Sequence, residues 1–388
     1  MAVDVKDAPA TGRLLIRNIG TLLTGDLAQP IAASECLLIE NGLIAGFAEA
    51  PADRVIDAQG CAVAPGLIDS HCHPVFGDWT PRQNQLGWIE MGVNGGVTSL
   101  LSAGEVHLPG RPKDAEGVKA LAMVAQRCFQ NFRPLGAKVI AGAPVMELDF
   151  DRDFYVGLKA AGIHRIGEIG LGTVARGPDA ARVTGWCRDL GIETIMHTGG
   201  PSIAGSHLVT AEDVLMAQPD VVSHINGGPT SIAHEDIRLL CREARGALEV
   251  VHNGNEKSAL VAMQAARGAG RLADFLIGTD APAGSGVQPN GMLRMVTLLA
   301  SLGDLPAELA WCCASGNVAR RRGLAQGLLA IGHPADLVFM DRPGGSGGKD
   351  VLESMAMGNI PGIGAVMIDG TMRCGRSRST PPSARVPA

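Results

Sequence analysis

Hydrophobic and polar residues alternate along the chain in two different styles. Residues 14–63 consist of short apolar runs separated by turns, and IENGLI places an Asn-Gly pair between two apolar segments, which predicts a β-hairpin. Residues 333–373 return to this style, with ADLVFMD followed by AVMIDGTM around an Asp-Gly pair. We therefore expect the two ends of the chain to form one small β domain together.

The middle of the chain alternates short apolar strands with helical stretches such as GVKALAMVAQRCFQN. Eight strand candidates occur there: 66–73, 96–104, 138–145, 164–170, 192–199, 220–227, 247–254 and 274–281. Eight strands separated by helices predict an α/β fold, a parallel (β/α)8 TIM barrel. The expected organisation is 1–63 for the first part of a β-sandwich domain, 64–330 for the barrel, 331–375 for the second part of the β-sandwich domain, and 376–388 for a mobile tail.

Composition narrows the classes of function. A chain of 388 residues with 46% hydrophobic residues is long enough for one barrel with a smaller domain, or for two to three average domains. The net charge of −6 indicates no basic surface for nucleic acid. The nine cysteines show no C-x-x-C spacing, and the first residues do not resemble a signal peptide, so we expect a cytoplasmic protein with reduced thiols. No run approaches 18 apolar residues, so no membrane span is expected.

Residues that can bind metal ions stand near the C-terminal ends of several predicted strands. The stretch GLIDSHCHP places His71 and His73 on one face of a strand, with Cys72 turned away. The other candidates lie in the fourth, fifth, sixth and eighth strands, in this order: Glu168, His197, His224 and Asp280. Because the active site of such barrels lies at the C-terminal ends of the strands, we expect these six side chains to converge.

Each of these residues has an ordinary structural alternative when it is taken alone. An H-x-H pair can be two polar residues after a strand, a single histidine can be hydrogen-bonded in the core, Glu168 can be an ion-pair partner, and Asp280 can cap a helix. Buried imidazoles and carboxylates are costly unless they are paired or ligated. Six of them at one barrel mouth favour two adjacent divalent metal sites, and histidine-rich ligation favours zinc or iron(II) over magnesium.

The motif PGLIDSHCHP, the later single histidines, GTDAP and the closing GHPADLVFMD resemble the amidohydrolase superfamily over nearly the whole chain. Many members bridge two metal ions with a carboxylated lysine from strand 4. Here HRIGEIGLGT contains no lysine, so the resemblance implies that Glu168 is the bridge. It implies His71, His73 and Asp280 as ligands of the first metal, and His197 and His224 as ligands of the second. It also implies that Asp280 carries a proton from the attacking water to the leaving nitrogen.

The stretches GDWTPRQ, HLPGRPKDA, GEIGLGT, MHTGGPSIAGS, VVSHINGGPT and DAPAGSG resemble the enamidases of this superfamily. That resemblance implies hydrolysis of 6-oxo-1,4,5,6-tetrahydronicotinate to 2-formylglutarate and ammonia in nicotinate degradation, by a homotetramer with zinc, iron or a mixed pair. Trp79 stands where a tyrosine is expected, which leaves open another lactam or imide, or deamination of an aromatic ring. A non-catalytic scaffold would lack some ligands, and all six positions are filled.

A substrate that carries a carboxylate needs a cation to bind it. Arg82, Arg111 and Arg294 each follow a predicted strand, and each can equally be an ordinary surface arginine. Arg82 is nearest to the H-x-H motif in the sequence. Together with Trp79, it is a candidate for substrate binding, as are Thr198 in the HTGG turn and Asn226 in the HINGG turn.

Overall fold

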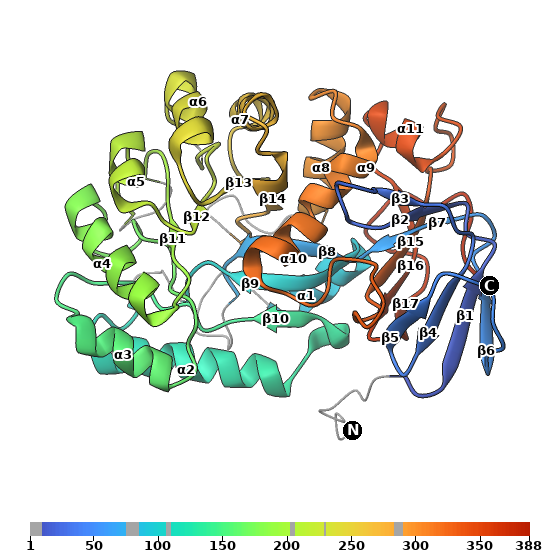
Figure 1. Cartoon of the computed structure of the whole chain (residues 1–388), viewed down its shortest axis with the longest axis horizontal. Coiled ribbons are helices and arrows are strands. Elements are labelled where there is room, and N and C mark those ends of the chain that lie inside the picture. Colours follow the sequence, from blue (N-terminus) through green and yellow to red (C-terminus); the bar gives the residue numbers. More distant parts are fainter. Residues whose placement is uncertain (1–9, 75–84, 106–109, 202–205, 229, 283–289) are drawn as a thin grey trace.

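The computed structural model describes residues 10–74, 85–105, 110–201, 206–228, 230–282 and 290–388. Strands from the two ends of the chain, blue and red in Figure 1, lie side by side at one end of the molecule, and the middle of the chain occupies the rest. Within the ranges described, no helix is long and apolar enough to cross a membrane.

Seven strands of the middle region form two parallel sheets, in the orders β10-β9-β8 and β11-β12-β13-β14. Their bounds are Leu67–Cys72 (β8), Val97–Ser102 (β9), Lys138–Ile140 (β10), Ile195–Met196 (β11), Val221–Val222 (β12), Ala247–Val251 (β13) and Phe275–Gly278 (β14). The sheets are joined where Cys72 forms a parallel bridge with Ala281, and where Gly167 donates its N–H to the Pro144 carbonyl at 2.7 Å. These contacts close the strands into a barrel.

The fourth predicted strand, 164–170, is not a regular strand, which corrects the sequence-based expectation. It forms only two isolated parallel bridges, to Glu193 and Met196. A Cβ on Gly167 would lie 3.0 Å from the Gly104 Cα, so the segment passes unusually close to neighbouring backbone. Close approach of this kind interrupts the regular ladder while the segment still fills the position between β10 and β11.

Helices surround the barrel strands (Figure 1). The helices are α1 (Gln85–Asn94), α2 (Ala115–Asn131), α3 (Arg152–Ala160), α4 (Gly177–Leu190), α5 (Ala211–Ala217), α6 (His234–Glu243), α7 (Glu256–Gly268), α8 (Gly291–Ser301), α9 (Ala307–Cys313), α10 (Gly316–Arg322) and α11 (Val351–Ala356).

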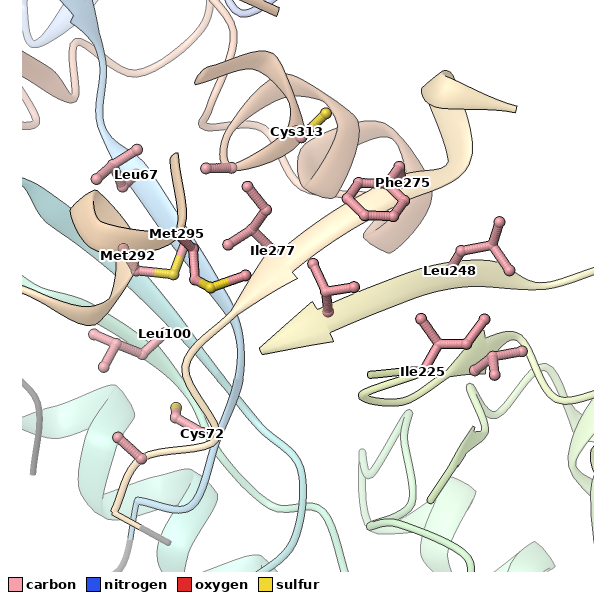
Figure 2. Packing of buried hydrophobic residues seen from close by; sticks show 14 of the residues in the cluster. Leu67, Cys72, Leu100, Ile225, Leu248, Phe275, Ile277, Met292, Met295 and Cys313 are labelled. Atoms are coloured by element: carbon pink, nitrogen blue, oxygen red, sulfur yellow. The ribbon is translucent and has the colours of Figure 1, made fainter. Parts of the chain in front are cut away.

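Strand alternation divides the barrel side chains between two apolar clusters. Leu67, Leu100 and Phe275 point outward and pack with residues of α8 and α9, as Figure 2 shows. Their chain neighbours Ile68 and Leu101 belong to a separate cluster inside the barrel. The period of two along each strand therefore builds both the barrel wall and its interior.

An extra residue in β8 decides where the H-x-H motif points. Asp69 pairs with Leu100, whereas Cys72 pairs with Ser102, so three steps along β8 match two along β9. Irregularities of this kind re-aim the side chains that follow. Cys72 therefore joins the outer apolar cluster (Figure 2), and the two histidines that flank it turn toward the barrel mouth.

The two chain ends contribute two sheets, in the orders β5-β4-β1-β6 and β17-β16-β15-β7-β2-β3. The strands are β1 (Arg13–Arg17), β2 (Thr21–Leu23), β3 (Ile31–Ala32), β4 (Leu37–Glu40), β5 (Leu43–Gly46), β6 (Arg54–Asp57), β7 (Ala62–Pro65), β15 (Leu337–Asp341), β16 (Gly362–Ile368) and β17 (Thr371–Cys374). The antiparallel pairing of β7 with β15 joins the two ends of the chain. Residues from both sheets share one apolar cluster, which includes Ile16, Leu37, Val63 and Phe339.

Four charged side chains connect the barrel to these sheets, and we call them the junction cluster: Arg133, Lys138, Asp336 and Asp369. The Lys138 ammonium lies 2.6 Å from Asp336 and 2.8 Å from Asp369. Arg133 lies 2.8 Å from the second oxygen of Asp369, and the Asp369 N–H donates to the remaining oxygen of Asp336 at 2.9 Å. Each carboxylate oxygen of this cluster thus has a donor.

The segment 376–388 is held against the sheets, although a mobile tail was expected. Arg385 reaches both oxygens of the buried Asp341, at 2.7 and 3.0 Å. Ala388 exchanges two backbone hydrogen bonds of 2.9 Å with Asp57, on the edge strand β6. A buried carboxylate and an open strand edge both need partners, and this segment supplies them.

Candidate metal centre

The four histidines and two carboxylates predicted as metal ligands converge at the C-terminal ends of the barrel strands, and all six are buried. The Nε2 atoms of His71 and His73 lie 3.5 and 3.1 Å from Oδ1 of Asp280. The same two atoms lie 3.6 and 3.7 Å from Oε2 of Glu168. Ligands that surround one ion tetrahedrally at about 2.1 Å lie about 3.4 Å from one another. This spacing suits a divalent cation.

Glu168 faces a second group of ligands through its other oxygen. Its Oε1 lies 2.7 Å from Nε2 of His224, which in turn lies 3.2 Å from Nδ1 of His197. The candidate ligand atoms of these three residues all lie within 4.8 Å of one another. A carboxylate with one oxygen toward each pair of histidines can bridge two cations.

Two of the six residues have a backbone conformation that L-amino acids rarely adopt. The φ angles are +29° for His224 and +57° for Asp280. Asp280 is held there because its N–H donates to the His71 carbonyl at 2.8 Å and its own carbonyl accepts from Nδ2 of Asn253 at 2.8 Å. Strained backbone concentrates at functional sites, where the surrounding structure holds it. Here the strain turns two side chains into the mouth.

Burial and neighbouring charge control the protonation of these groups. Burial and the adjacent His224 lower the pKa of His197 to about 4, so its imidazole is neutral near pH 7. Burial alone would raise the pKa of Glu168, but His71 and His224 hold it well below its usual range. Burial opposes ionisation of Asp280 as well, yet His73 and His71 lower its pKa. Both carboxyl groups are therefore ionised and can bind a cation.

Orphaned buried atoms test whether a metal ion fits the residues present. The carboxylate oxygens nearest to the His71 Nε2 atom, at 3.5 and 3.6 Å, are too far away for a normal hydrogen bond. The buried Oε1 of Glu168 also lacks a hydrogen-bond partner of suitable geometry among the described residues. In the same part of the chain, no lysine or arginine forms an ion pair with Glu168 or Asp280. Divalent cations would bind the unpaired ligand atoms and balance the negative charge of Glu168 and Asp280.

The residues proposed for substrate binding fall into two groups. Trp79 and Arg82 lie outside the described residues. The Thr198 hydroxyl is buried and donates to the His224 carbonyl at 2.9 Å. The amide of Asn226 both donates to and accepts from the backbone of Val251 at 2.9 Å. These two side chains therefore tie the site to the barrel strands through backbone groups.

The other two candidate arginines lie in the described part of the chain. Arg111 contacts the buried carboxylate of Glu147, which also accepts from the Thr173 hydroxyl at 2.7 Å. Arg294 is an exposed residue of α8. The guanidinium of Arg111 is thus engaged within the protein.

Sequence reasoning missed three buried carboxylates close to the site: Asp69, Glu105 and Glu249. Asp69 accepts from the N–H and hydroxyl of Thr279 at 2.9 and 2.6 Å, which ties β8 to the end of β14. The Glu249 Oε1 lies 2.7 Å from Nδ1 of His71. The available signal was a charged residue inside an apolar strand, as in ALEVV, because such residues are rarely buried without a role.

A closed parallel barrel with buried histidines and carboxylates at its C-terminal mouth is typical of barrel enzymes that use divalent metal ions. The chain is 42% identical over 379 residues to enamidase of Eubacterium barkeri, covering 96% of this chain and 98% of the relative. A crystal structure of enamidase, described as a new member of the amidohydrolase superfamily, superposes with a TM-score of 0.92 at 42% identity, covering 97% of this chain and 99% of that one.

A more distant likeness also spans nearly the whole chain. Imidazolonepropionase of Salinispora arenicola is 26% identical over 408 residues, covering 93% of this chain and 99% of the relative. No family model matches the chain. The full-length likeness shows that the chain belongs to the enamidase family of the amidohydrolase superfamily. The TIM barrel and the superfamily predicted from the sequence are thereby confirmed.

Proposed function

We propose that the protein hydrolyses the cyclic amide bond of 6-oxo-1,4,5,6-tetrahydronicotinate, yielding 2-formylglutarate and ammonia, as a step in nicotinate degradation. The observation that carries the proposal is the cluster in which Glu168 lies between His71, His73 and Asp280 on one side and His197 and His224 on the other. The full-length likeness to enamidase supports the same reaction for this chain.

Two divalent metal ions per subunit would occupy the cluster, with zinc, iron(II) or a mixed pair as the proposed identities. His71, His73 and Asp280 would hold the first ion, His197 and His224 the second, and Glu168 both. Bound there, the ions would lower the pKa of a water molecule and polarise the amide carbonyl of the substrate. The neutral imidazole of His197 and the ionised carboxylate of Glu168 are the protonation states that ligation requires.

Asp280 is the proposed catalytic base and acid. Its carboxylate is buried at the centre of the mouth, and its lowered pKa means that it starts the reaction ionised. It accepts a proton from the attacking water and delivers it to the ring nitrogen as the C–N bond breaks. The released enamine tautomerises and is hydrolysed to the aldehyde and ammonia. The positive φ of Asp280 supports this role, because strained backbone concentrates at functional sites.

The substrate carboxylate would bind Arg82, and the ring would contact Trp79 where a tyrosine is expected. The remaining proposals follow the same likeness. The sheets at the chain ends would form a β-sandwich domain built from 1–63 and 331–375, the barrel would span 64–330, and 376–388 would lie on the β-sandwich. The enzyme would act as a cytoplasmic homotetramer.

The test measures ammonia release from 6-oxo-1,4,5,6-tetrahydronicotinate by the zinc-loaded protein, beside a panel of plain lactams, hydantoins and imides. We expect fast and selective turnover of the first compound. A Trp79→Tyr variant is measured beside the wild type. It restores the residue type expected at this position and should retain this activity. Turnover of another cyclic amide alone would refute the substrate assignment and would leave the proposed metal centre unaffected.

A second candidate is hydrolysis of another lactam or imide, or deamination of a ring, at the same centre. The likeness to imidazolonepropionase over almost the entire chain favours keeping it. Trp79 favours it too, since an indole would stack on a ring where a phenol would donate a hydrogen bond. Activity on aminopurines or imidazolones in the same panel would distinguish this candidate.

A further inference from the structure

A buried chain of polar groups runs beneath the candidate metal centre, inside the barrel. Glu249, on β13, lies at its centre with 1% of its surface exposed. Its Oε1 is 2.7 Å from Nδ1 of His71 and 3.2 Å from the Ser223 hydroxyl, and its Oε2 accepts a hydrogen bond from the Ser70 hydroxyl. Glu249 belongs to none of the groups of candidate metal ligands in the described residues.

Arg322 supports this carboxylate from the far side. It is the last residue of α10, and only 1% of its side chain is exposed. Its Nη1 donates to the Ser70 carbonyl at 3.2 Å and lies 4.0 Å from Oε2 of Glu249, while its Nε lies 2.5 Å from Glu193. A buried guanidinium between two carboxylates offsets part of their charge, which would be costly if it were left unpaired inside the barrel.

The geometry points to Glu249 as a positioning residue for the metal ligand His71, an inference that rests on the proposed function. Nδ1 of His71 carries the proton and donates a hydrogen bond to Glu249. The lone pair of Nε2 then faces Glu168 and Asp280, which lie 3.6 and 3.5 Å away. The hydrogen bond selects the tautomer, fixes the ring orientation and makes Nε2 a stronger donor to a cation.

Two of the other ligand histidines have backbone partners at the corresponding position. Nδ1 of His73 lies 3.3 Å from the Gly104 carbonyl, and Nε2 of His197 lies 3.1 Å from the Gly200 carbonyl. A backbone carbonyl polarises an imidazole less than an ionised carboxylate does. The loss of Glu249 should therefore lower the affinity for the metal ion bound by His71 and His73. The affinity for the other ion should stay unchanged.

The test compares Glu249→Gln and Glu249→Asp with a matched control, Glu193→Gln. The control removes a carboxylate from the same buried chain but not from His71. Each protein is loaded with Zn²⁺, and the affinities of both ions are measured by competition with a chromogenic chelator. The Co²⁺ absorption spectrum of each variant reports the geometry of the ligands independently of catalysis.

We expect Glu249→Gln to lower the affinity of one ion by about 10–100-fold and to change the Co²⁺ spectrum, with kcat reduced and KM unchanged. Glu249→Asp should affect the same ion to a smaller extent, and it carries the test if the glutamine variant does not fold. Glu193→Gln should lower thermal stability and leave both affinities unchanged.

Two results would overturn the assignment. In one, the Glu249 variants bind both ions as tightly as the wild type does. In the other, Glu193→Gln weakens the same ion to the same extent, which would mean that the effect is only structural. If the wild-type protein bound no metal, both the proposed function and this inference would be refuted. If the wild type binds metal and the Glu249 variants bind it equally well, only this inference is refuted.

Discussion

The barrel mouth and the junction cluster both bury carboxylates, but they compensate the negative charge differently. In the junction cluster, Asp336 and Asp369 meet a lysine and an arginine, and each carboxylate oxygen has a donor. At the mouth, Glu168 and Asp280 meet histidines at distances of 2.7 to 3.7 Å, and no lysine or arginine of the described residues pairs with them.

This contrast separates a structural cluster from a ligand site. Charges that are fully paired within the protein are complete without any other component. Imidazole and carboxylate groups that converge with buried atoms left over offer a site that a cation from outside the chain can fill. The difference lies in the partners of the carboxylates, since each cluster contains a fully buried carboxylate, Asp336 in one and Glu168 in the other.

The largest expected effect comes from breaking the mouth at its central residue. Glu168→Gln removes the charge that both groups of histidines share. We expect loss of bound metal together with a fall in ammonia release of more than about 100-fold, because the loss of outer partners of metal ligands already costs roughly 10–100-fold. Metal content is measured by elemental analysis. The junction variant Asp336→Asn is the control, and it should retain metal. Full metal occupancy with unchanged turnover in Glu168→Gln would refute the bridging role.

Breaking the junction cluster should affect stability and spare the chemistry. Lys138→Met leaves Asp336 and Asp369 without their shared cation, and the Asp336 side chain is fully buried. We expect the free energy of unfolding to fall by about 3 kcal/mol or more, with unchanged kcat for the folded protein. Urea denaturation measures the change. Lys257→Met, at an exposed lysine, is a matched control and should cost less than about 1 kcal/mol. Equal losses in the two variants would show that the junction cluster adds no stability.

The pH dependence of stability sharpens the comparison, because Glu105 at the mouth side has no cationic lysine or arginine beside it among the described residues. It accepts hydrogen bonds from the Gly142 and Ala143 amides at 2.5 and 3.3 Å and from the Ser102 side chain. Burial raises its pKa from 4.5 to about 7 despite these hydrogen bonds. The folded protein therefore binds a proton more tightly than the unfolded chain does. The stabilisation is fully present below pH 4.5 and is lost as the pH rises through 7.

In chelator-treated protein, this group alone should lower the free energy of unfolding by roughly 3 kcal/mol between pH 4.5 and pH 8. Glu105→Gln keeps an oxygen for the two amides and removes the titration, so its stability should decline less over that range. Urea denaturation at a series of pH values measures both proteins. Parallel curves for the wild type and the variant would rule out this origin of the pH dependence.

The smallest effect concerns the segment 376–388. Arg385→Ala removes the side-chain partner of Asp341, but the guanidinium is 46% exposed and water screens the pair. We expect a loss of about 1 kcal/mol, measured by urea denaturation, with activity unchanged. Arg376→Ala, in the same segment and exposed, should change stability by less than about 0.5 kcal/mol. A larger loss for Arg376→Ala than for Arg385→Ala would contradict this account.

The candidate ligands could be predicted because parallel barrel strands bring their C-terminal ends to one mouth, so residues such as His197 and Asp280 needed no local geometry. The fourth strand could not be predicted in detail, since its irregularity comes from the close approach of Gly167 to other segments. The segment 376–388 has the composition of a mobile tail, and its partners Asp57 and Asp341 lie far away in the sequence. Contacts of that range leave no local pattern.

The pairing of β7 with β15 has a consequence for the order in which the ribosome makes this chain. The strand β7 is synthesised before any metal ligand. Its partner β2 precedes it in the chain and is therefore available for pairing at once. Its other neighbour, β15, emerges only after the whole barrel has been translated. At roughly 5–20 residues per second, that open edge waits for tens of seconds. An unpaired strand edge attracts other chains, so the nascent protein is most exposed to aggregation during this interval.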